Sequence, residues 1–110
     1  MATPPQSTKT SLQQRLSGRA RQRWPQVAAI EVRFRAQYAD VTAELADGST
    51  QPLMRLRYAE SASMWGFAVY LASRGGYQDS VLANGHTAGT PEDALDTACG
   101  QYLGDPTAWI

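Results

Sequence analysis

Arginines are the side chains of this sequence best suited to chemistry, and eight of the nine fall into two groups. A guanidinium can hold a carboxylate or a phosphate through two parallel hydrogen bonds. One group lies within residues 10–24, and the other alternates with apolar residues in the stretches 30–36 and 53–59. The members without an obvious acidic neighbour are the candidate contacts to a nucleic-acid backbone or to an acidic partner: Arg15, Arg19, Arg21, Arg23, Arg33 and Arg57.

Residues suited to catalysis or metal binding are scarce. The chain has one histidine, His86, in the small-residue stretch NGHTAG, and one cysteine, Cys99. These two cannot supply zinc-type ligand spacing, and no EF-hand pattern, phosphate-binding glycine loop or nucleophile elbow is present. The sequence therefore predicts no catalytic, cofactor-binding or metal-ligating residue and no cofactor, and it favours a non-enzymatic protein.

The charge of the chain is balanced overall but unevenly distributed. Its 110 residues include 10 basic and 10 acidic side chains, for a formal net charge of zero. Residues 1–57 carry nine basic and four acidic side chains, whereas residues 58–110 carry one basic and six acidic. A neutral chain lacks the overall positive field that is typical of nucleic-acid-binding domains.

Composition also bears on location and source. A single cysteine suits a reducing compartment, and the longest apolar run, WGFAVYLA, is too short to span a bilayer. Nine arginines against one lysine, with abundant alanine, are typical of a GC-rich bacterial genome, so arginine usage alone is weak evidence of recognition. We expect a cytoplasmic protein with no membrane partner.

The first group of arginines is predicted to lie on an N-terminal helix. Residues 1–9 are rich in Pro, Ser and Thr and are predicted to form a disordered tail. Thr10 is the candidate N-cap, an apolar residue recurs every four positions from Leu12 to Ala20, and Pro25 ends the segment.

The second group is predicted to lie on an antiparallel meander over residues 28–36, 39–45 and 53–59. A two-residue turn at Asp47-Gly48 would pair Val41 with Met54 and Asp40 with Arg55. A turn at Gln37-Tyr38 would pair Asp40 with Arg35 as well. Opposite charges facing one another are an ordinary way to complete the solvent side of a sheet, so Arg35 and Arg55 are predicted to be structural.

The aromatic segment that follows has two interpretations. Residues 61–73 fit a strand, with Trp65, Phe67, Val69 and Leu71 on one face of a hairpin around Gly75-Gly76, but they also fit helical spacing. Gly66 and the aromatic content favour the strand, and the register across the two glycines stays open.

A second helix closes the chain. Thr90 is its candidate N-cap, Pro91 its first residue, and Gly104 and Pro106 its stop. We therefore predict an α+β fold in which an antiparallel meander sheet of four to five strands carries an N-terminal and a C-terminal helix on one face, and a single domain over residues 10–110.

Two functional hypotheses follow. The first is a small interaction module or accessory protein that binds an unknown protein partner or a second copy of itself. The second is binding of a nucleic-acid backbone through the basic helix and the sheet arginines. The two differ on one structural point: if the helices lie side by side, Glu92, Asp93 or Asp96 would neutralise the helix arginines.

Overall fold

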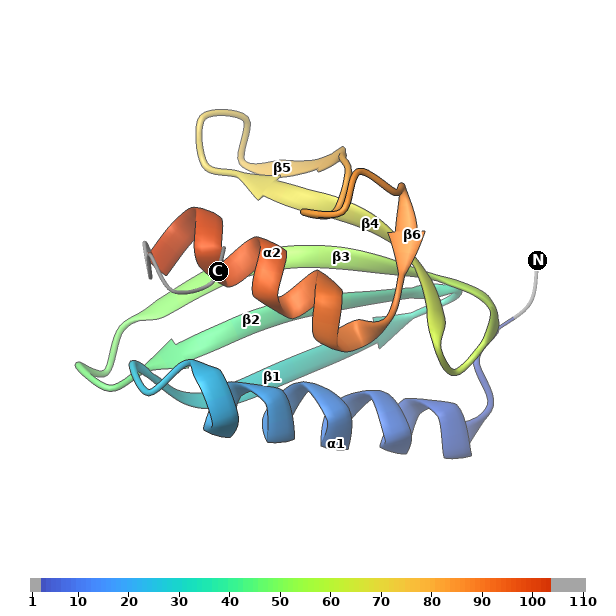
Figure 1. The fold of residues 1–110 in the computed structure, drawn as a ribbon, viewed down its shortest axis with the longest axis horizontal. Coiled ribbons are helices and arrows are strands. Elements are labelled where there is room, and N and C mark those ends of the chain that lie inside the picture. The colour runs from blue at the N-terminus through green and yellow to red at the C-terminus, as the bar shows by residue number, and fades with distance from the viewer. Residues whose placement is uncertain (1–2, 104–110) are drawn as a thin grey trace.

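The computed structural model describes residues 3–103 and confirms the predicted fold class (Figure 1). Its elements, in chain order, are α1 (Gln6–Arg23), β1 (Val27–Arg35), β2 (Tyr38–Leu45), β3 (Thr50–Ser61), β4 (Met64–Leu71), β5 (Gly76–Asp79), β6 (Ala88–Gly89) and α2 (Pro91–Leu103). Strands β1 to β5 are neighbours in chain order, each antiparallel to the next, and β6 pairs with β4. Both helices lie on the same side of this sheet.

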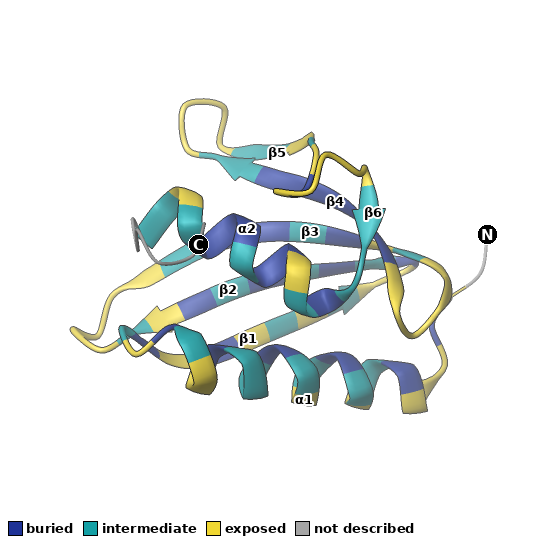
Figure 2. Ribbon diagram, in the orientation of Figure 1, coloured by how far each residue is buried: buried dark blue, intermediate teal, exposed yellow. Residues whose placement is uncertain are grey.

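The core lies between the sheet and the helices, and Figure 2 shows the buried residues of α1 and α2 on their sheet-facing sides. Helix α1 contributes Leu12, Leu16 and Ala20, as its four-residue spacing predicts. In β4, alternate residues from Trp65 to Val69 enter the same core. The residues between them face away from the helices, and we call that side of the sheet the open face.

The hairpin between β2 and β3 has the predicted pairing, but its turn is longer than predicted and one strand contains a bulge. Asp40 pairs with Arg55 and Val41 with Met54, as predicted, but Thr42 pairs with Pro52, so an extra residue lies between the two registers. The turn is also one residue longer than predicted, because the Leu45 amide donates to the Ser49 carbonyl at 2.8 Å across a loop that contains Gly48 at φ +89°. Turn and bulge offset one another, and Leu53 and Met54 are both buried.

The hairpin between β1 and β2 differs from the prediction by two residues. Its turn is Ala36-Gln37, with Ala36 at a positive φ of 51°, and Arg33 rather than Arg35 lies opposite Asp40. The pairing of Arg35 with Asp40 is therefore wrong. Because a shift of two residues keeps each side chain on its own face, the division between core and open face is unchanged.

Helix α1 begins four residues before Thr10. The N-cap position is Pro5, the Lys9 amide donates to the Pro5 carbonyl at 3.0 Å, and Thr8 is buried. The predicted N-cap at Thr10 is wrong, and residues 6–9 of the predicted tail are helical because tertiary packing compensates for weak local signals.

The remaining elements agree with the sequence where they are described. Residues 64–71 form a strand, and the β4–β5 hairpin pairs Leu71 with Gly76, which settles its register. Thr90 Oγ1 accepts the Asp93 amide at 3.2 Å, so the predicted N-cap of α2 is confirmed. The predicted stop at Gly104 and Pro106 lies outside the described residues, and a single domain over 10–110 stays a prediction.

Candidate binding groove on the open face of the sheet

The arginines of α1 face carboxylates of α2 along what we call the inter-helix seam, formed by Arg15, Arg19, Arg23, Trp24, Glu92 and Asp96. Arg15 donates to both carboxylate oxygens of Glu92, from Nε and from Nη2, at 2.8 Å each. Arg19 Nη2 and Arg23 Nη1 donate to Asp96 Oδ2 at 2.6 and 3.2 Å, and the Trp24 indole donates to its Oδ1 at 3.0 Å. Three of the six candidate contacts are thus neutralised within the chain.

The seam also shifts protonation equilibria. The hydrogen bond from Arg15 lowers the pKa of Glu92, and burial offsets part of that effect. Hydrogen bonds to Glu92 and Asp96 raise the pKa of Arg15 and Arg19, respectively. The fourth arginine of the helix, Arg21, lies exposed on α1. The Asp93 side chain makes no hydrogen bond to these arginines, but its charge adds a smaller contribution to the raised pKa of Arg19.

On the open face, the strand register arranges charged and aromatic residues in two rows across the sheet. One row runs through Arg35, Tyr38, Arg57 and Gly66, each the partner of the next. The second row runs through Arg33, Asp40, Arg55, Ala68 and Asp79. The two rows together hold four arginines and two aspartates, so basic side chains outnumber acidic ones along them.

Arg55 is the fixed member of these rows. Its Nε donates to Asp40 Oδ1 at 2.7 Å, and its guanidinium lies 4.5 Å from the ring centre of Tyr77 and 5.4 Å from that of Tyr38. The hydrogen bond to Asp40 raises the pKa of Arg55. Its charge is compensated and its guanidinium lies over two aromatic rings, so Arg55 has a structural role within the sheet.

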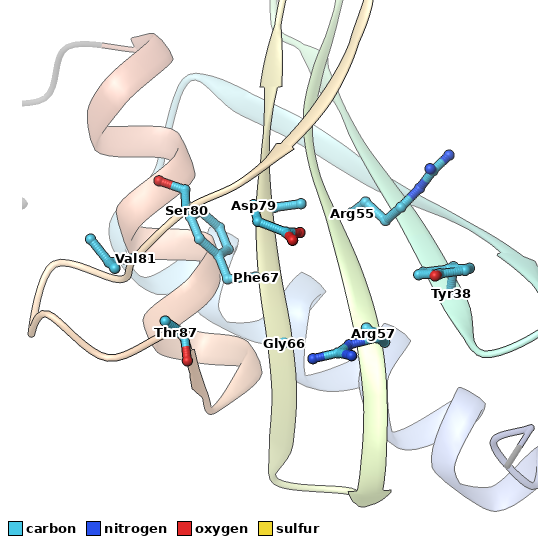
Figure 3. Close-up of a pocket in the computed structure, with 10 residues that line it drawn as sticks. Tyr38, Arg55, Arg57, Gly66, Phe67, Asp79, Ser80, Val81 and Thr87 are labelled. Atoms are coloured by element: carbon cyan, nitrogen blue, oxygen red, sulfur yellow. The ribbon is translucent and has the colours of Figure 1, made fainter. Parts of the chain in front are cut away.

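Arg57, two residues further along β3, is placed differently (Figure 3). Its guanidinium points across to β4 and lies over Gly66, so that a β carbon there would be 3.2 Å from both Nε and Nη2. It has no hydrogen bond or ion pair with any residue between 3 and 103. Gly66 therefore provides a seat for a guanidinium whose hydrogen-bonding capacity is unused.

Arg57 lies in a groove of about 360 Å³ on the open face. Gly66 and Ala68 form its floor, because β4 presents two small residues where its neighbours present long ones. We define the groove by its lining residues: Tyr38, Arg55, Arg57, Gly66, Phe67, Ala68, Asp79, Ser80, Val81 and Thr87. A second hollow shares four of them and extends toward Arg35 and Tyr77, which makes a continuous trough along the face.

The candidate contacts are therefore dispersed. Arg15, Arg19 and Arg23 lie in the seam, and Arg21 lies apart on α1. Arg33 lies on β1, where Nη2 is 3.4 Å from a Glu31 carboxylate oxygen; both side chains are largely exposed, so this pair contributes little. Only Arg57 lines the groove.

The residues considered for catalysis lie in different environments. Cys99 is fully buried in the core, and burial raises the pKa of its thiol to about 12, whereas His86 is exposed. Within the described part of the chain, no three His, Cys, Asp or Glu residues gather in a way that could hold a metal ion. Neither described helix combines the length and apolar character needed to cross a membrane.

Sequence reasoning named Arg57 but missed the rest of the groove. Gly66 served there only as evidence for a strand, and Asp79 was not singled out. The available signal was the pattern Gly66, Phe67, Ala68, in which two small residues alternate with a core aromatic and leave the opposite face of β4 bare. Comparison with protein-family models, with curated proteins and with solved structures finds no match to this chain.

Proposed function

We propose that the protein is a small, non-enzymatic, cytoplasmic interaction module that holds a segment of a protein partner in the groove of the open face. One observation carries this proposal: Arg57 is seated over Gly66 in the groove with no acceptor among the described residues. A guanidinium held in place loses little conformational entropy when it accepts a ligand. A carboxylate on the partner is the complementary group.

The charge distribution supports a protein partner over a nucleic acid. A nucleic-acid backbone is bound by a run of unpaired cations, whose number sets the affinity and its salt dependence. Here three helix arginines already bind Glu92 and Asp96, and on the open face Arg55 binds Asp40 and Arg33 lies beside Glu31. Such a face leaves few unpaired cations for a polyanion, but it suits a segment with separate charges.

The composition of the groove supports the same conclusion. Tyrosine and arginine are enriched where proteins bind one another, because they combine a large contact area with polar ends. Tyr38, Arg55 and Arg57 lie together on one side, and half-exposed Val81 adds an apolar surface on the other. The small floor at Gly66 and Ala68 leaves room for a side chain from the partner.

An amide-shift titration of isotope-labelled protein tests the proposal. The probes are a capped pentapeptide, Gly-Glu-Val-Gln-Gly, its counterpart with Gln in place of Glu, and a mixed-sequence DNA duplex. We expect the acidic peptide to shift the amides of Arg57, Gly66 and Ala68 more strongly than the neutral peptide does. Equal shifts from both peptides, or none, would contradict the proposal.

The duplex decides the competing hypothesis. We expect any shifts that it causes at low salt to disappear at physiological salt, because few unpaired cations remain to bind phosphates. Persistent shifts along α1 and β1 at physiological salt would favour nucleic-acid binding. Concentration-dependent sedimentation of the protein alone, lost in Arg57→Gln, would identify a second copy of the chain as the partner.

A further inference from the structure

The groove contains a second unused charge, on the side opposite Arg57. Asp79 lines the groove from β5, and its carboxylate has no hydrogen bond or ion pair with any described residue. Arg57 and Asp79 do not pair with each other, although both line the same groove. The open face elsewhere places opposite charges in contact, as in Arg55 and Asp40 at 2.7 Å. Separation of the two groove charges is therefore a local feature.

The register explains how the two charges are kept apart. Arg57 pairs with Gly66 on β4, and Asp79 pairs with Ala68, so the whole width of β4 lies between them. Neighbouring strands are about 4.8 Å apart, which places the backbones of β3 and β5 roughly 10 Å from one another. Arg57 bends over Gly66, and Asp79 lies further along β4 on its other side, so the bare floor of Gly66 and Ala68 separates the two (Figure 3).

Nearby side chains leave the two charges without a partner. Arg55, the nearest other cation on β3, is bound to Asp40 and directed away from Arg57 in Figure 3. A hydroxyl is available on each side of the floor, from Tyr38 and from Ser80. The groove thus offers an unpaired cation on one side and an unpaired anion on the other.

We propose that the groove recognises an extended segment bearing an acidic and a basic side chain two residues apart, with the acid against Arg57 and the base against Asp79. Residues i and i+2 of an extended chain project to the same side about 6.6 Å apart. Gly66 and Ala68, the β4 partners of Arg57 and Asp79, are also two residues apart, so the two charged positions are offset along β4 by that same spacing. This inference rests on the proposed function and adds to it the partner's charge pattern.

A protein–peptide double-mutant cycle tests this pairing. The probes are the capped pentapeptides Gly-Glu-Val-Lys-Gly, Gly-Glu-Val-Gln-Gly, Gly-Gln-Val-Lys-Gly and Gly-Gln-Val-Gln-Gly. The proteins are wild type, Arg57→Gln and Asp79→Asn. For the wild type we expect the peptide with both charges to bind about threefold to fivefold more tightly than either singly charged peptide, as pairs of this exposure contribute.

The variants assign each charge to its partner. Arg57→Gln should abolish the preference for Glu over Gln in the peptide and keep the preference for Lys, and Asp79→Asn should do the reverse. Glu31→Gln, which removes an exposed carboxylate from β1 outside the groove, is the matched control and should keep both preferences. Amide spectra of each variant establish that its fold is intact.

The outcomes separate this inference from the proposed function. If the peptides shift groove amides but the Lys preference is absent, or survives in Asp79→Asn, the charge-pair inference is wrong and the carboxylate site at Arg57 stands. If neither Glu nor Lys affects binding, both proposals fail. Loss of both preferences in either single variant would show one indivisible site and would contradict separate recognition.

Discussion

The inter-helix seam and the open face both contain arginines, but only the seam uses them fully. In the seam, Arg15 and Arg19 each reach a carboxylate at hydrogen-bonding distance. On the open face, Arg55 is bound in the same way, whereas Arg57 lies over a glycine without an acceptor. The same residue type is therefore paired in the seam and unpaired over Gly66, and the proposed role of Arg57 rests on that difference.

The two regions also differ in what removal of a charge would leave behind. Asp96 in the seam has a side chain only 13% exposed and accepts hydrogen bonds from Arg19, Arg23 and Trp24. Deleting it strands donors that have little access to water. Arg57 is exposed and has no acceptor, so its removal leaves no buried group without a hydrogen-bond partner.

The largest expected effect comes from Asp96→Ala. Loss of this shared acceptor leaves two arginines close together and the buried Trp24 indole without its acceptor. We expect the free energy of unfolding to fall by about 2–3 kcal/mol, measured by urea denaturation. Asp93→Ala on the same helix is the control and should cost less than about 1 kcal/mol, from its position in the first turn. Equal losses in both variants would show that the seam contributes no more than an exposed acid does.

A smaller difference in the free energy of unfolding is expected between variants of two arginines on β3, Arg55 and Arg57. Arg55→Gln removes an ion pair and two ring contacts, and should lower the free energy of unfolding by about 1 kcal/mol. Arg57→Gln should change it by less than about 0.5 kcal/mol, because surface substitutions without partners have small effects. A cost for Arg57→Gln as large as that for Arg55→Gln would make Arg57 structural and contradict its assignment as a free binding group.

The seam should also give stability a dependence on acid. The pKa of Glu92 is lowered in the folded protein, so its contribution is present above the unfolded value near 4.5 and is lost as the pH falls through the folded pKa. Urea denaturation at pH 7 and at successively lower pH should show wild type losing up to about 1 kcal/mol more than Glu92→Gln, given an exposure of 31% for this side chain. Parallel pH profiles for the two proteins would show that Glu92 does not contribute to the acid dependence of stability.

Sequence reasoning recovered those features of both regions that depend on local pattern. Alternation placed Asp40 and Arg55 on one face, and the spacing of Leu12, Leu16 and Ala20 gave the buried side of α1. It misplaced Arg33 and Arg35 because the turn uses Ala36 at positive φ, a conformation that sequence alone gives no reason to expect.

The groove depends on longer-range information. The seat of Arg57 requires β3 and β4 to pair so that Arg57 faces Gly66, and this register is set by the whole core. In the same way, Glu92 and Asp96 could be named as partners of the helix arginines only on the condition that the helices pack together. Tertiary placement of charges is thus the part that local sequence patterns do not contain.

The smallest effect on stability, and the closest test of the open face, is expected from Gly66→Ala. The added methyl group would lie 3.2 Å from Nε and Nη2 of Arg57, so the guanidinium must move off its seat. The cost is small, because the exposed Arg57 guanidinium can move into solvent and alanine is less unfavourable than glycine within a strand, and we expect less than about 0.5 kcal/mol. Binding of the acidic pentapeptide should nevertheless weaken, since the guanidinium is no longer held in position.

Gly76→Ala in β5, where a β carbon meets nothing within 4 Å, is the matched control and should leave binding unchanged. If Gly66→Ala binds the acidic peptide as tightly as wild type, the glycine seat does not position Arg57 for its ligand.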